Sequence, residues 1–589
     1  MNIIGISGLN NSVLFKKTMF PDLEKGYYRI AQGFDSAAAL VSEEGVISAV
    51  AEERFNREKA TNLFPINAIE YCLNSKNISL DNIDFIAHGF DYEPFRDLYL
   101  KDEYLEKQFS QVYSKEALIK VLEQNLPSSN MSEKLVQVPH HIAHAASAFY
   151  PSGFDESLIL VSDGMGEVHS ATIAIGSGNE IEIIEQIPAL HSLGILYGVF
   201  TIYLGFQMGM DEYKVMGLAP YGDRRKYFAK IMDFINLKDN GTYTIPLLFL
   251  NETNEDKETY RRTLDSLVNI FGPKRENDSE ITQDHMDIAA GLQAALESSL
   301  MHVLRYFKKE TGQKNLCMAG GVALNCTANG LIKRSRIFKD IFIQPAAGDD
   351  GTAVGAGLYI VNQKSSRPYH KKMALPYWGP EYENDDIMHL LNKEVGIEYK
   401  HYESFKELAK RLAEYINQGK IVGYFQERME FGPRALGNRS ILADPRDPEM
   451  RDRVNSLIKK REGFRPFAPA VIEEEANTYF EIAKGDEDIY SYMLFVTRVR
   501  ENFRKNLPAI THVDGSARVQ TVCKEKNQRF WTVINEFGKI SGIPIILNTS
   551  FNVKGQPIVC SPSEAIETFL FAGLDLLVLG NFLILRNNI

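Results

Sequence analysis

The same order of short apolar strands occurs twice in the N-terminal part of the chain. Strands are expected at residues 3–7, 37–41 and 46–51, followed by a helix at 66–73 that Pro65 introduces. A second series is expected, with glycine-bearing turns between its strands, at 158–161, 170–175 and 181–184. Two copies of such a unit predict a duplicated α/β fold whose halves face each other across a cleft. Strands of this kind also occur by chance in many α/β proteins, and the pattern alone leaves that alternative open.

The rest of the chain alternates helices and strands around one polar stretch. We expect a long amphipathic helix at 288–307 and strands at 316–319 and 341–344. Residues 363–384 are rich in Lys, Ser, Pro and Gly, which is typical of a linker or a surface excursion. The sequence therefore predicts a first domain at 1–365, a linker at 366–400 and a second domain at 401–589.

Charge and cysteine usage exclude several classes of protein. Among 589 residues, 77 are acidic and 65 basic, a net charge of −12, so we expect no general nucleic-acid surface, which would need a positive field. The five cysteines are scattered without a C-x-x-C pair, which predicts a reducing compartment and free thiols, mostly buried. Because neither a signal peptide nor a run of about 18 apolar residues occurs, we expect a cytoplasmic protein that binds no membrane.

Histidines and acidic loops form the first candidate site. On a helix that starts after Pro139, His140 and His144 share a face and can present nitrogens to one metal ion. Asp163 and Asp349 lie in glycine-bearing loops at strand ends, where ligands usually bind in α/β proteins. Two His and two Asp suit Fe²⁺, Mn²⁺ or Zn²⁺ better than Mg²⁺ or Ca²⁺. Core or surface histidines and helix-capping aspartates remain alternatives, and Asp350 competes with Asp349 for the ligand role.

Glycine loops form the second candidate site, for a nucleotide. Gly320, Gly321 and Asn325 follow a strand and open a helix, so their backbone N–H groups can approach a phosphate or ribose. Gly348, in the loop that also holds Asp349, would form the other side of the cleft. The alternative is that these glycines serve packing only. Lys59 and Lys214 could add phosphate-binding charge, or be ordinary solvated lysines.

Arginines held by Gly, Pro and aromatic neighbours form the third candidate site. Arg434, Arg465 and Arg518 each lie in such a loop, and a rigid guanidinium matches phosphate or carboxylate oxygens with two hydrogen bonds. Ser550, after the strand at 545–547, adds a hydroxyl donor. In a chain of negative net charge these loops predict a focused anion pocket. Buried ion pairs between loops are the alternative.

Seven ordered motifs across nearly the whole chain resemble those of the NodU/CmcH/TobZ carbamoyltransferases. They are HHxAHAASA from His140, the SDG turn at Asp163, KVMGLAPYG from Lys214, GGVALN from Gly320, GDDG from Gly348, EFGPRALGNRS from Glu430 and LNTSFN from Leu547. The resemblance implies an N-terminal domain with the duplicated fold of actin-like ATPases, similar to the universal tRNA threonylcarbamoyl-transfer protein. It also implies a YrdC-like α/β C-terminal domain.

The resemblance further implies a two-step reaction. Carbamoyl phosphate and ATP would give carbamoyl-adenylate and pyrophosphate in the YrdC-like domain, and an acceptor hydroxyl would then take the carbamoyl group and expel AMP in the first domain. Family positions that hold carbamoyl phosphate match Arg434, Arg465, Arg518 and Ser550. Metal ligands that also take part in catalysis match His140, His144, Asp163 and Asp349, with Fe²⁺ as the expected metal. The nucleotide contacts expected are Lys59, Gly164, Lys214, Gly320, Gly321, Asn325 and Gly348.

Two departures from the family's sequence pattern limit how far these roles can be assigned to this chain. Many relatives begin with HDxAA, whereas Phe34 stands in the His position here, and the chain carries an insertion at about 11–32. We expect an O-carbamoyltransferase whose partners are carbamoyl phosphate and a small natural-product or sugar-like hydroxyl acceptor. The alternatives are threonylcarbamoyl-type transfer to tRNA, which the acidic charge disfavours, and a non-catalytic nucleotide-binding regulatory module. A homodimer is left open.

Overall fold

The computed structural model describes residues 1–126, 130–394 and 397–586. Its chain divides into two compact units, the first formed by Met1–Asn56 and Ala60–Met373. The second is formed by Ala374–Ile589 together with the short segment Arg57–Lys59, which comes from the N-terminal part of the sequence. They are called unit 1 and unit 2 below.

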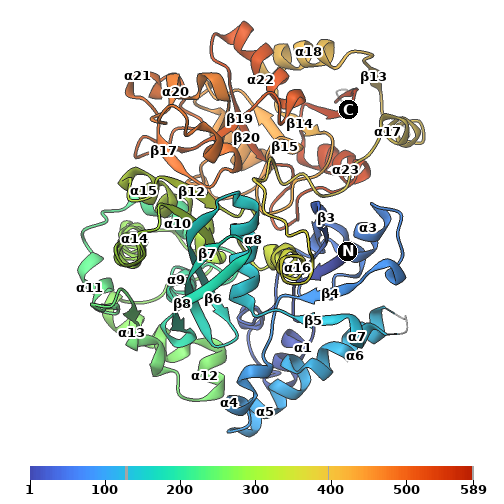
Figure 1. The fold of residues 1–589 in the computed structure, drawn as a ribbon. Helices are drawn as coiled ribbons and strands as arrows, with labels where there is room; N and C mark the ends of the chain where they lie inside the picture. The colour runs from blue at the N-terminus through green and yellow to red at the C-terminus, as the bar shows by residue number, and fades with distance from the viewer. Residues whose placement is uncertain (127–129, 395–396, 587–589) are drawn as a thin grey trace. The chain divides into compact units, whose positions relative to one another are not determined.

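Unit 1 contains two five-stranded sheets with the same topology (Figure 1). Their strand orders are β3-β2-β1-β4-β5 and β8-β7-β6-β11-β12. In each, the first three strands along the chain pair antiparallel and two later strands extend the sheet in parallel. The duplication expected from the sequence is thereby confirmed. The strands of the first sheet are β1 (Asn2–Ile6), β2 (Ala37–Ser42), β3 (Gly45–Ala51), β4 (Phe85–His88) and β5 (Leu135–Gln137), and those of the second are β6 (Glu156–Gly166), β7 (His169–Ser177), β8 (Glu180–Pro188), β11 (Asn315–Ala319) and β12 (Asp340–Ile343).

Two helices of small residues pack against each other and against these sheets. Helix α8 (His140–Ser152) contacts β6 and β11, and α16 (Asp350–Lys364) contacts β1 and β2. A Cβ on Gly355 would lie 1.7 Å from the backbone oxygen of Ala143, so the close crossing of α8 and α16 requires glycine there. This crossing places the first residues of both helices at the carboxyl ends of the strands, where Figure 1 shows α8 beside α16.

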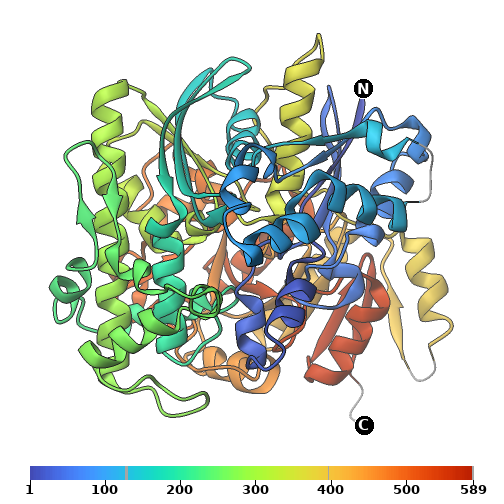
Figure 2. The same ribbon diagram turned by 90° about the horizontal axis from the view of Figure 1, so that it is seen from below.

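The remaining elements of unit 1 surround this centre. The antiparallel strands β6 to β8 form the long teal hairpins of Figure 2. The other elements are α1 (Ser12–Met19), α2 (Glu53–Asn56), α3 (Ile66–Asn74), α4 (Arg96–Tyr99), α5 (Glu103–Gln108), α6 (Lys115–Asn125), α7 (Met131–Lys134), α9 (Leu193–Tyr203), α10 (Glu212–Leu218), α11 (Phe228–Met232), β9 (Asn236–Leu237), β10 (Tyr243–Thr244), α12 (Asn254–Thr259), α13 (Arg261–Phe271), α14 (Gln283–Thr311) and α15 (Cys326–Ser335).

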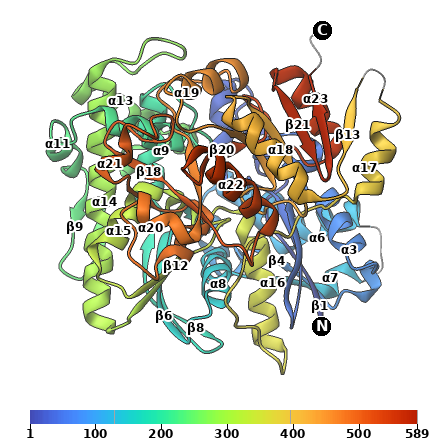
Figure 3. The same ribbon diagram turned by 90° about the horizontal axis from the view of Figure 1, so that it is seen from above.

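Unit 2 is built on an eight-stranded sheet in the order β13-β22-β21-β14-β15-β20-β16-β19. Helices α18 and α22 lie side by side (Figure 3), and both contribute to one apolar core with the strands. The sheet strands are β13 (Tyr399–His401), β14 (Val422–Phe425), β15 (Arg439–Ala443), β16 (Ala468–Ile472), β19 (Gln520–Val522), β20 (Ile545–Ser550), β21 (Leu576–Leu579) and β22 (Phe582–Leu585). The other elements are α17 (Asn384–Leu391), α18 (Phe405–Asn417), α19 (Met450–Arg453), α20 (Ala476–Tyr479), β17 (Val496–Arg498), α21 (Glu501–Arg504), β18 (Ser516–Arg518), α22 (Gln528–Ser541) and α23 (Pro562–Ala572).

Several expectations about individual segments change in the structure. The stretch expected as a linker contributes α17 and β13 to unit 2, and Tyr377 within it forms a β-bridge with Glu430. Strand β6 does not end before Asp163 but runs on through an irregular stretch to Gly166. The cysteines are free and four of the five are buried, as expected. Within the described ranges, the helices are all too short or too polar to cross a membrane.

Candidate functional site

The first candidate site starts on helix α8, whose first residue is His140. Because His144 follows four residues later, both imidazoles lie on one face of the helix, and their Nε2 atoms are 3.1 Å apart. Both side chains are fully buried. Pro139 immediately precedes the helix, in agreement with the expected start.

Two aspartates from other elements complete this group. The Oδ2 atom of Asp163 lies 3.6 Å from His140 Nε2, and Oδ1 of Asp349 lies 3.5 Å from His140 Nε2 and 3.7 Å from His144 Nε2. All four ligand atoms lie within 4.8 Å of one another. Atoms bound at about 2.0–2.2 Å around one ion are about 3–4 Å apart, so the donor set fits a transition metal. Asp350 instead accepts a hydrogen bond from Gly351 N, so geometry favours Asp349.

The charges in this cluster are strongly coupled. Burial works against a charged imidazole at His140, but the Asp349 and Asp163 carboxylates overcome it and raise its pKa well above the ordinary value. Burial likewise opposes a charged Asp163, yet the hydrogen bond from His140 and the charge of His144 lower its pKa. The pKa of Asp349 is lowered in the same way. The group therefore favours a cation at its centre, whether a proton or a metal ion.

Groups outside the cluster fix the orientation of His140. Its Nδ1 lies 2.8 Å from the carbonyl oxygen of Gly89, which must accept, so Nδ1 carries a hydrogen and Nε2 is the nitrogen that can bind a metal once it has lost its proton. The Phe90 ring stacks on the imidazole at 4.0 Å. Glu167 Oε1 accepts from the backbone N–H of His140 at 2.8 Å and of Asp91 at 2.9 Å. This buried carboxylate replaces the cap that Pro139 cannot provide and ties the helix to the loop that holds Gly89.

The glycine turn after β11 supports Asp163 rather than opening a helix directly. Gly321 N donates to Asp163 Oδ1 at 2.8 Å, so that N–H is already used. A Cβ on Gly320 would lie 2.3 Å from Ser162 O, which accounts for the glycine by packing. A short 3₁₀ turn follows, and Asn325 then caps α15 by accepting from Ala328 N. Here the packing alternative explains the motif as well as the nucleotide prediction does.

The other predicted nucleotide contacts of unit 1 are scattered over several elements. Lys214 forms an ion pair with Asp211 at 3.0 Å. Asn325 Nδ2 donates to Gln293 Oε1 at 2.9 Å. A Cβ on Gly164 would meet nothing within 4 Å, whereas one on Gly348 would lie 3.4 Å from Asp350 Oδ1. Their role as nucleotide contacts stays a prediction.

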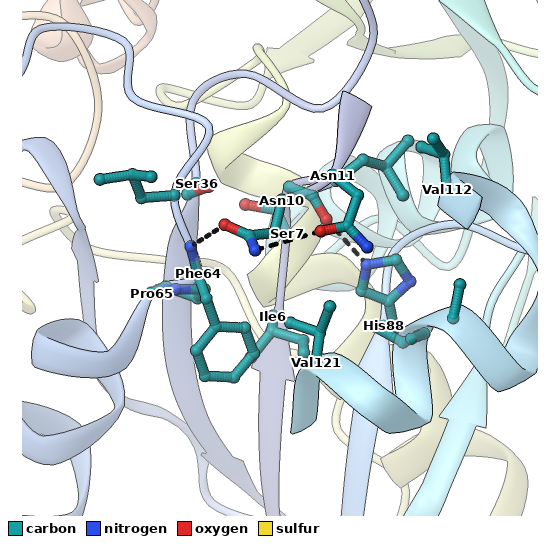
Figure 4. Close-up of a pocket in the computed structure, with 15 residues that line it drawn as sticks. Ile6, Ser7, Asn10, Asn11, Ser36, Phe64, Pro65, His88, Val112 and Val121 are labelled. Carbon is teal, nitrogen blue, oxygen red and sulfur yellow. Dashed lines mark hydrogen bonds between the residues drawn. The ribbon is translucent and has the colours of Figure 1, made fainter. Parts of the chain in front are cut away.

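A pocket lies at the carboxyl end of β1, where the inserted segment begins (Figure 4). Asn10 Oδ1 accepts from Phe64 N at 3.0 Å, and His88 Nε2 lies 2.9 Å from the carbonyl oxygen of Gly8. Because His88 directly precedes Gly89, this pocket connects the insertion to the loop that orients His140.

A basic cluster in unit 2 surrounds a buried lysine. Lys459 donates to the backbone oxygen of Ser550, and also to the backbone oxygen and Oδ1 of Asn552 at 2.9 and 2.8 Å. Burial lowers its pKa well below the ordinary lysine value, and the nearby cations Arg461, Arg465 and Lys59 lower it further. Several cations held this close predict an anionic ligand.

Lys59 therefore belongs to unit 2, and its role as a nucleotide contact stays a prediction. Its segment is fixed by Arg57, which donates to the backbone oxygens of Ile558 and Pro557 and pairs with Glu564 at 3.0 Å. The sequence could not show this, because residues 57–59 lie between elements of unit 1.

The segments that carry Arg434 and Arg518 meet through a polar network. Gln520 Nε2 donates to Leu436 O at 2.7 Å, and Asn548 Nδ2 donates to Gln520 Oε1 at 2.8 Å. This network joins the loop after Arg434, the strand after Arg518 and the strand that ends at Ser550. Arg465 lies with the Lys459 cluster and pairs with Glu462 at 3.7 Å. The binding of carbamoyl phosphate by these residues stays a prediction.

Comparison with known proteins identifies the family. Residues 413–586 match the family model described as carbamoyltransferase C-terminus, and residues 29–358, more than half of the chain, match carbamoyltransferase N-terminus. The chain belongs to the carbamoyltransferase family. The expectation of a carbamoyltransferase enzyme is thereby confirmed.

Curated relatives of this carbamoyltransferase cover most of its length. It is 44% identical to the nodulation protein NolNO of Sinorhizobium fredii over 93% of this chain and 78% of that protein. It is 45% identical to the nodulation protein NolO of Bradyrhizobium diazoefficiens over 76% of this chain and 78% of that protein. Among solved structures, HypF of T. kodakarensis matches 61% of this chain and 47% of that chain at 16% identity and a TM-score of 0.28, too weak a likeness to support an argument.

Several candidate residues of this carbamoyltransferase were missed by the sequence reasoning. Lys459, Arg461 and Asn552 flank predicted site residues, but in a basic run and a polar turn they look like solvated side chains. Their signal was proximity to Arg465 and Ser550. Glu167 gives no local signal, because its function depends on backbone groups from two other segments.

Proposed function

We propose that this carbamoyltransferase uses ATP and carbamoyl phosphate to form carbamoyl-adenylate, and then carbamoylates a hydroxyl of a small natural-product or sugar-like acceptor. The observation that carries the proposal is the group of His140, His144, Asp163 and Asp349 in unit 1, in which the first three residues are buried and Asp349 is partly exposed. A chain with only a binding role would have no need of four coupled ligands in one site and a separate basic cluster around Lys459 in the other unit.

The first step is assigned to unit 2. Water cleaves carbamoyl phosphate to carbamate and inorganic phosphate, and a carbamate oxygen then attacks the α-phosphorus of ATP. A new P–O bond forms, and the bond to the β-phosphate breaks as pyrophosphate leaves. Lys59, Lys459, Arg461 and Arg465 supply the positive charge that both phosphate-bearing substrates require. Arg434, Arg518 and Ser550 would hold carbamoyl phosphate itself.

The second step is assigned to unit 1. The acceptor hydroxyl attacks the carbamoyl carbon, loses its proton, and AMP leaves with the bonding electrons. A divalent metal held by His140, His144, Asp163 and Asp349, with Fe²⁺ first and Mn²⁺ or Zn²⁺ next, would supply Lewis acidity. Gly89 keeps the lone pair of His140 directed at the ligand position, and Gly321 N orients Asp163. The burial of His140, His144 and Asp163 limits the access of water, which competes with the acceptor.

The proposal is tested on the purified full chain with ATP, carbamoyl phosphate and Fe²⁺, Mn²⁺ or Zn²⁺, but no acceptor. We expect carbamoyl phosphate-dependent release of pyrophosphate. Omission of carbamoyl phosphate serves as the negative control. Absence of nucleotide turnover with every metal would overturn the proposal.

The division between the two units is tested by a pair of variants. Arg434→Ala should abolish pyrophosphate release, because it removes a cation assigned to carbamoyl phosphate. His140→Ala should still release pyrophosphate but stop transfer to an acceptor. Equal loss of the first step in both variants would contradict the division.

A further inference from the structure

A tight turn in unit 2 places one histidine against the strand that carries Arg518. His512 N donates to Ser516 O at 2.8 Å, and Gly515 N donates to His512 O at 2.9 Å. Within this turn, Ser516 Oγ lies 2.6 Å from Asp514 Oδ1 and 3.1 Å from His512 Nδ1. His512, Asp514 and Ser516 therefore form a short hydrogen-bonded chain.

The direction of these hydrogen bonds fixes the tautomer of His512. The carboxylate of Asp514 can only accept, so Ser516 donates its hydroxyl hydrogen to it. The Ser516 oxygen must then accept from His512 Nδ1–H, and the lone pair of the neutral ring lies on Nε2. Burial lowers the pKa of His512 to about 4, against the opposing charge of Asp514 and with the help of Arg518. The ring is thus neutral near pH 7.

The lone pair of His512 is shielded from water and unused. Its Nε2 atom has no hydrogen-bond partner within residues 1–126, 130–394 and 397–586. In the same described part of the chain, Nε of Arg518 is also buried without a partner. Because Ser516 and Arg518 are two residues apart on β18, their side chains lie on one face of the strand. The charge of Arg518 acts on the His512 ring, so an unused acceptor and an unused cationic donor lie near each other. Buried polar groups without a partner need an explanation in a native protein, and a functional role in binding is one.

We propose that His512 Nε2 accepts a hydrogen bond from the NH₂ group of the carbamoyl substrate and makes unit 2 specific for carbamoyl over acetyl phosphate. The inference rests on the proposed function, in which Arg518 holds the phosphate-bearing substrate. The NH₂ and CH₃ groups that distinguish the two compounds are similar in size, so shape alone separates them poorly. A nitrogen that carries a lone pair and no hydrogen can accept a hydrogen bond from the NH₂ group. Against a CH₃ group the same lone pair has no hydrogen-bond partner, which disfavours binding.

The test compares carbamoyl phosphate as substrate with acetyl phosphate as competitive inhibitor of pyrophosphate release by the full chain. For the unmodified protein we expect carbamoyl phosphate to bind at least about 10-fold more tightly. His512→Phe keeps a ring of similar size without a lone pair. This variant should bind carbamoyl phosphate about 10- to 100-fold more weakly, and its affinity for acetyl phosphate should change less than about threefold.

A second variant separates recognition from packing. The Oε1 atom of His512→Gln can still accept, so this variant should regain part of the discrimination that His512→Phe loses. The inference would be overturned if His512→Phe lowered the affinity for both compounds equally, or changed neither affinity. Melting curves check that both variants fold.

The outcome for the unmodified protein is decisive by itself. If it binds acetyl phosphate as tightly as carbamoyl phosphate, the inference fails even where neither variant folds. If it releases no pyrophosphate with carbamoyl phosphate, the proposed function fails instead. The two failures are therefore distinguished by one measurement.

Discussion

His140 is held from three sides by groups that are not candidate ligands. Its ring nitrogen donates to Gly89 O, its face stacks on Phe90 and its backbone N–H donates to Glu167. His141, the next residue, is also buried, but its Nδ1 lies 2.8 Å from Thr172 Oγ1 and its side chain is not part of the four-residue cluster. Two adjacent histidines on one helix thus have different environments, and this contrast can be tested.

Replacing the two histidines separately should separate metal binding from packing. His140→Ala removes one of four ligands, so the metal bound per chain should fall from about one to near zero after loading and dialysis. His141→Ala creates a similar cavity in the same helix and should keep its metal. The measurement is elemental analysis of the folded variants. Equal loss of metal in both variants would show that disruption of the helix, rather than loss of the His140 ligand, causes the loss.

Metal binding at this site should release a proton. Burial opposes a charged imidazole at His140, but the Asp349 and Asp163 carboxylates raise its pKa above the ordinary value, which favours a proton on the ring in the absence of a metal. The metal needs the lone pair of Nε2 and must displace that proton. Affinity should therefore increase with pH, by about tenfold per unit, until the raised pKa is passed.

Calorimetric titration with Zn²⁺ in two buffers of different ionisation enthalpy measures this proton. We expect about one proton released per metal bound at pH 7, and the His141→Ala variant should release the same number. Affinity that does not change with pH between 6 and 8 would contradict the raised pKa.

At the scale of elements, the turn after β11 is fixed by one glycine. Gly320 has φ of +88°, and a Cβ there would lie 2.3 Å from Ser162 O on the neighbouring strand. Gly312, at the end of α14, also has positive φ, but a Cβ there would meet nothing within 4 Å. Both positions have positive φ, but Gly312 is in the left-handed helical region with ψ of 0°, whereas Gly320, with ψ of 156°, is in a region that essentially only glycine adopts, and Gly320 alone has the steric contact.

Alanine at these two glycines should therefore have unequal costs. Gly312→Ala should destabilise unit 1 by about 1–2 kcal/mol, the usual cost of a left-handed non-glycine residue. Gly320→Ala should cost at least about 3 kcal/mol, because β11 or β6 must also move. It should weaken metal binding too, since Gly321 N orients Asp163. Urea unfolding and metal titration measure both effects. Equal losses of unfolding free energy in the two variants would show that the backbone at Ser162 moves away from the new Cβ without cost.

Local patterns were sufficient to predict most strands and the His140 helix. The helix at 66–73 and the strand at 37–41 agree with α3 and β2 to within about one residue, because apolar periodicity and Pro65 act locally. The continuation of β6 past Asp163 was missed, since pairing with β7 resumes only at Gly166. Asn325 caps a helix because a 3₁₀ turn intervenes, which glycine content alone does not show.

At the scale of the whole molecule, the chain enters unit 2 twice. It leaves unit 1 for unit 2 at Arg57–Lys59, returns to unit 1, and enters unit 2 again at Ala374. The segment Arg57–Lys59 brings a lysine to the cluster of Lys459, Arg461 and Arg465. No local pattern could predict this, because the position of Lys59 depends on contacts of Arg57 with residues about five hundred positions later. A basic cluster assembled from such distant parts of the sequence indicates an anionic substrate.

Lys59→Met should therefore impair the first step of the reaction. Loss of a cation near the phosphate-bearing substrates should raise the KM for carbamoyl phosphate or ATP in pyrophosphate release about 10-fold or more, because hydrogen bonds to charged groups contribute about 1.5–3 kcal/mol. Lys410→Met, at an exposed position of α18 in the same unit, makes the same change of charge and should leave KM within about twofold. Steady-state kinetics of pyrophosphate release provide the comparison. If Lys59→Met impaired only transfer to the acceptor, Lys59 would serve the site in unit 1, and its assignment to the basic cluster would be wrong.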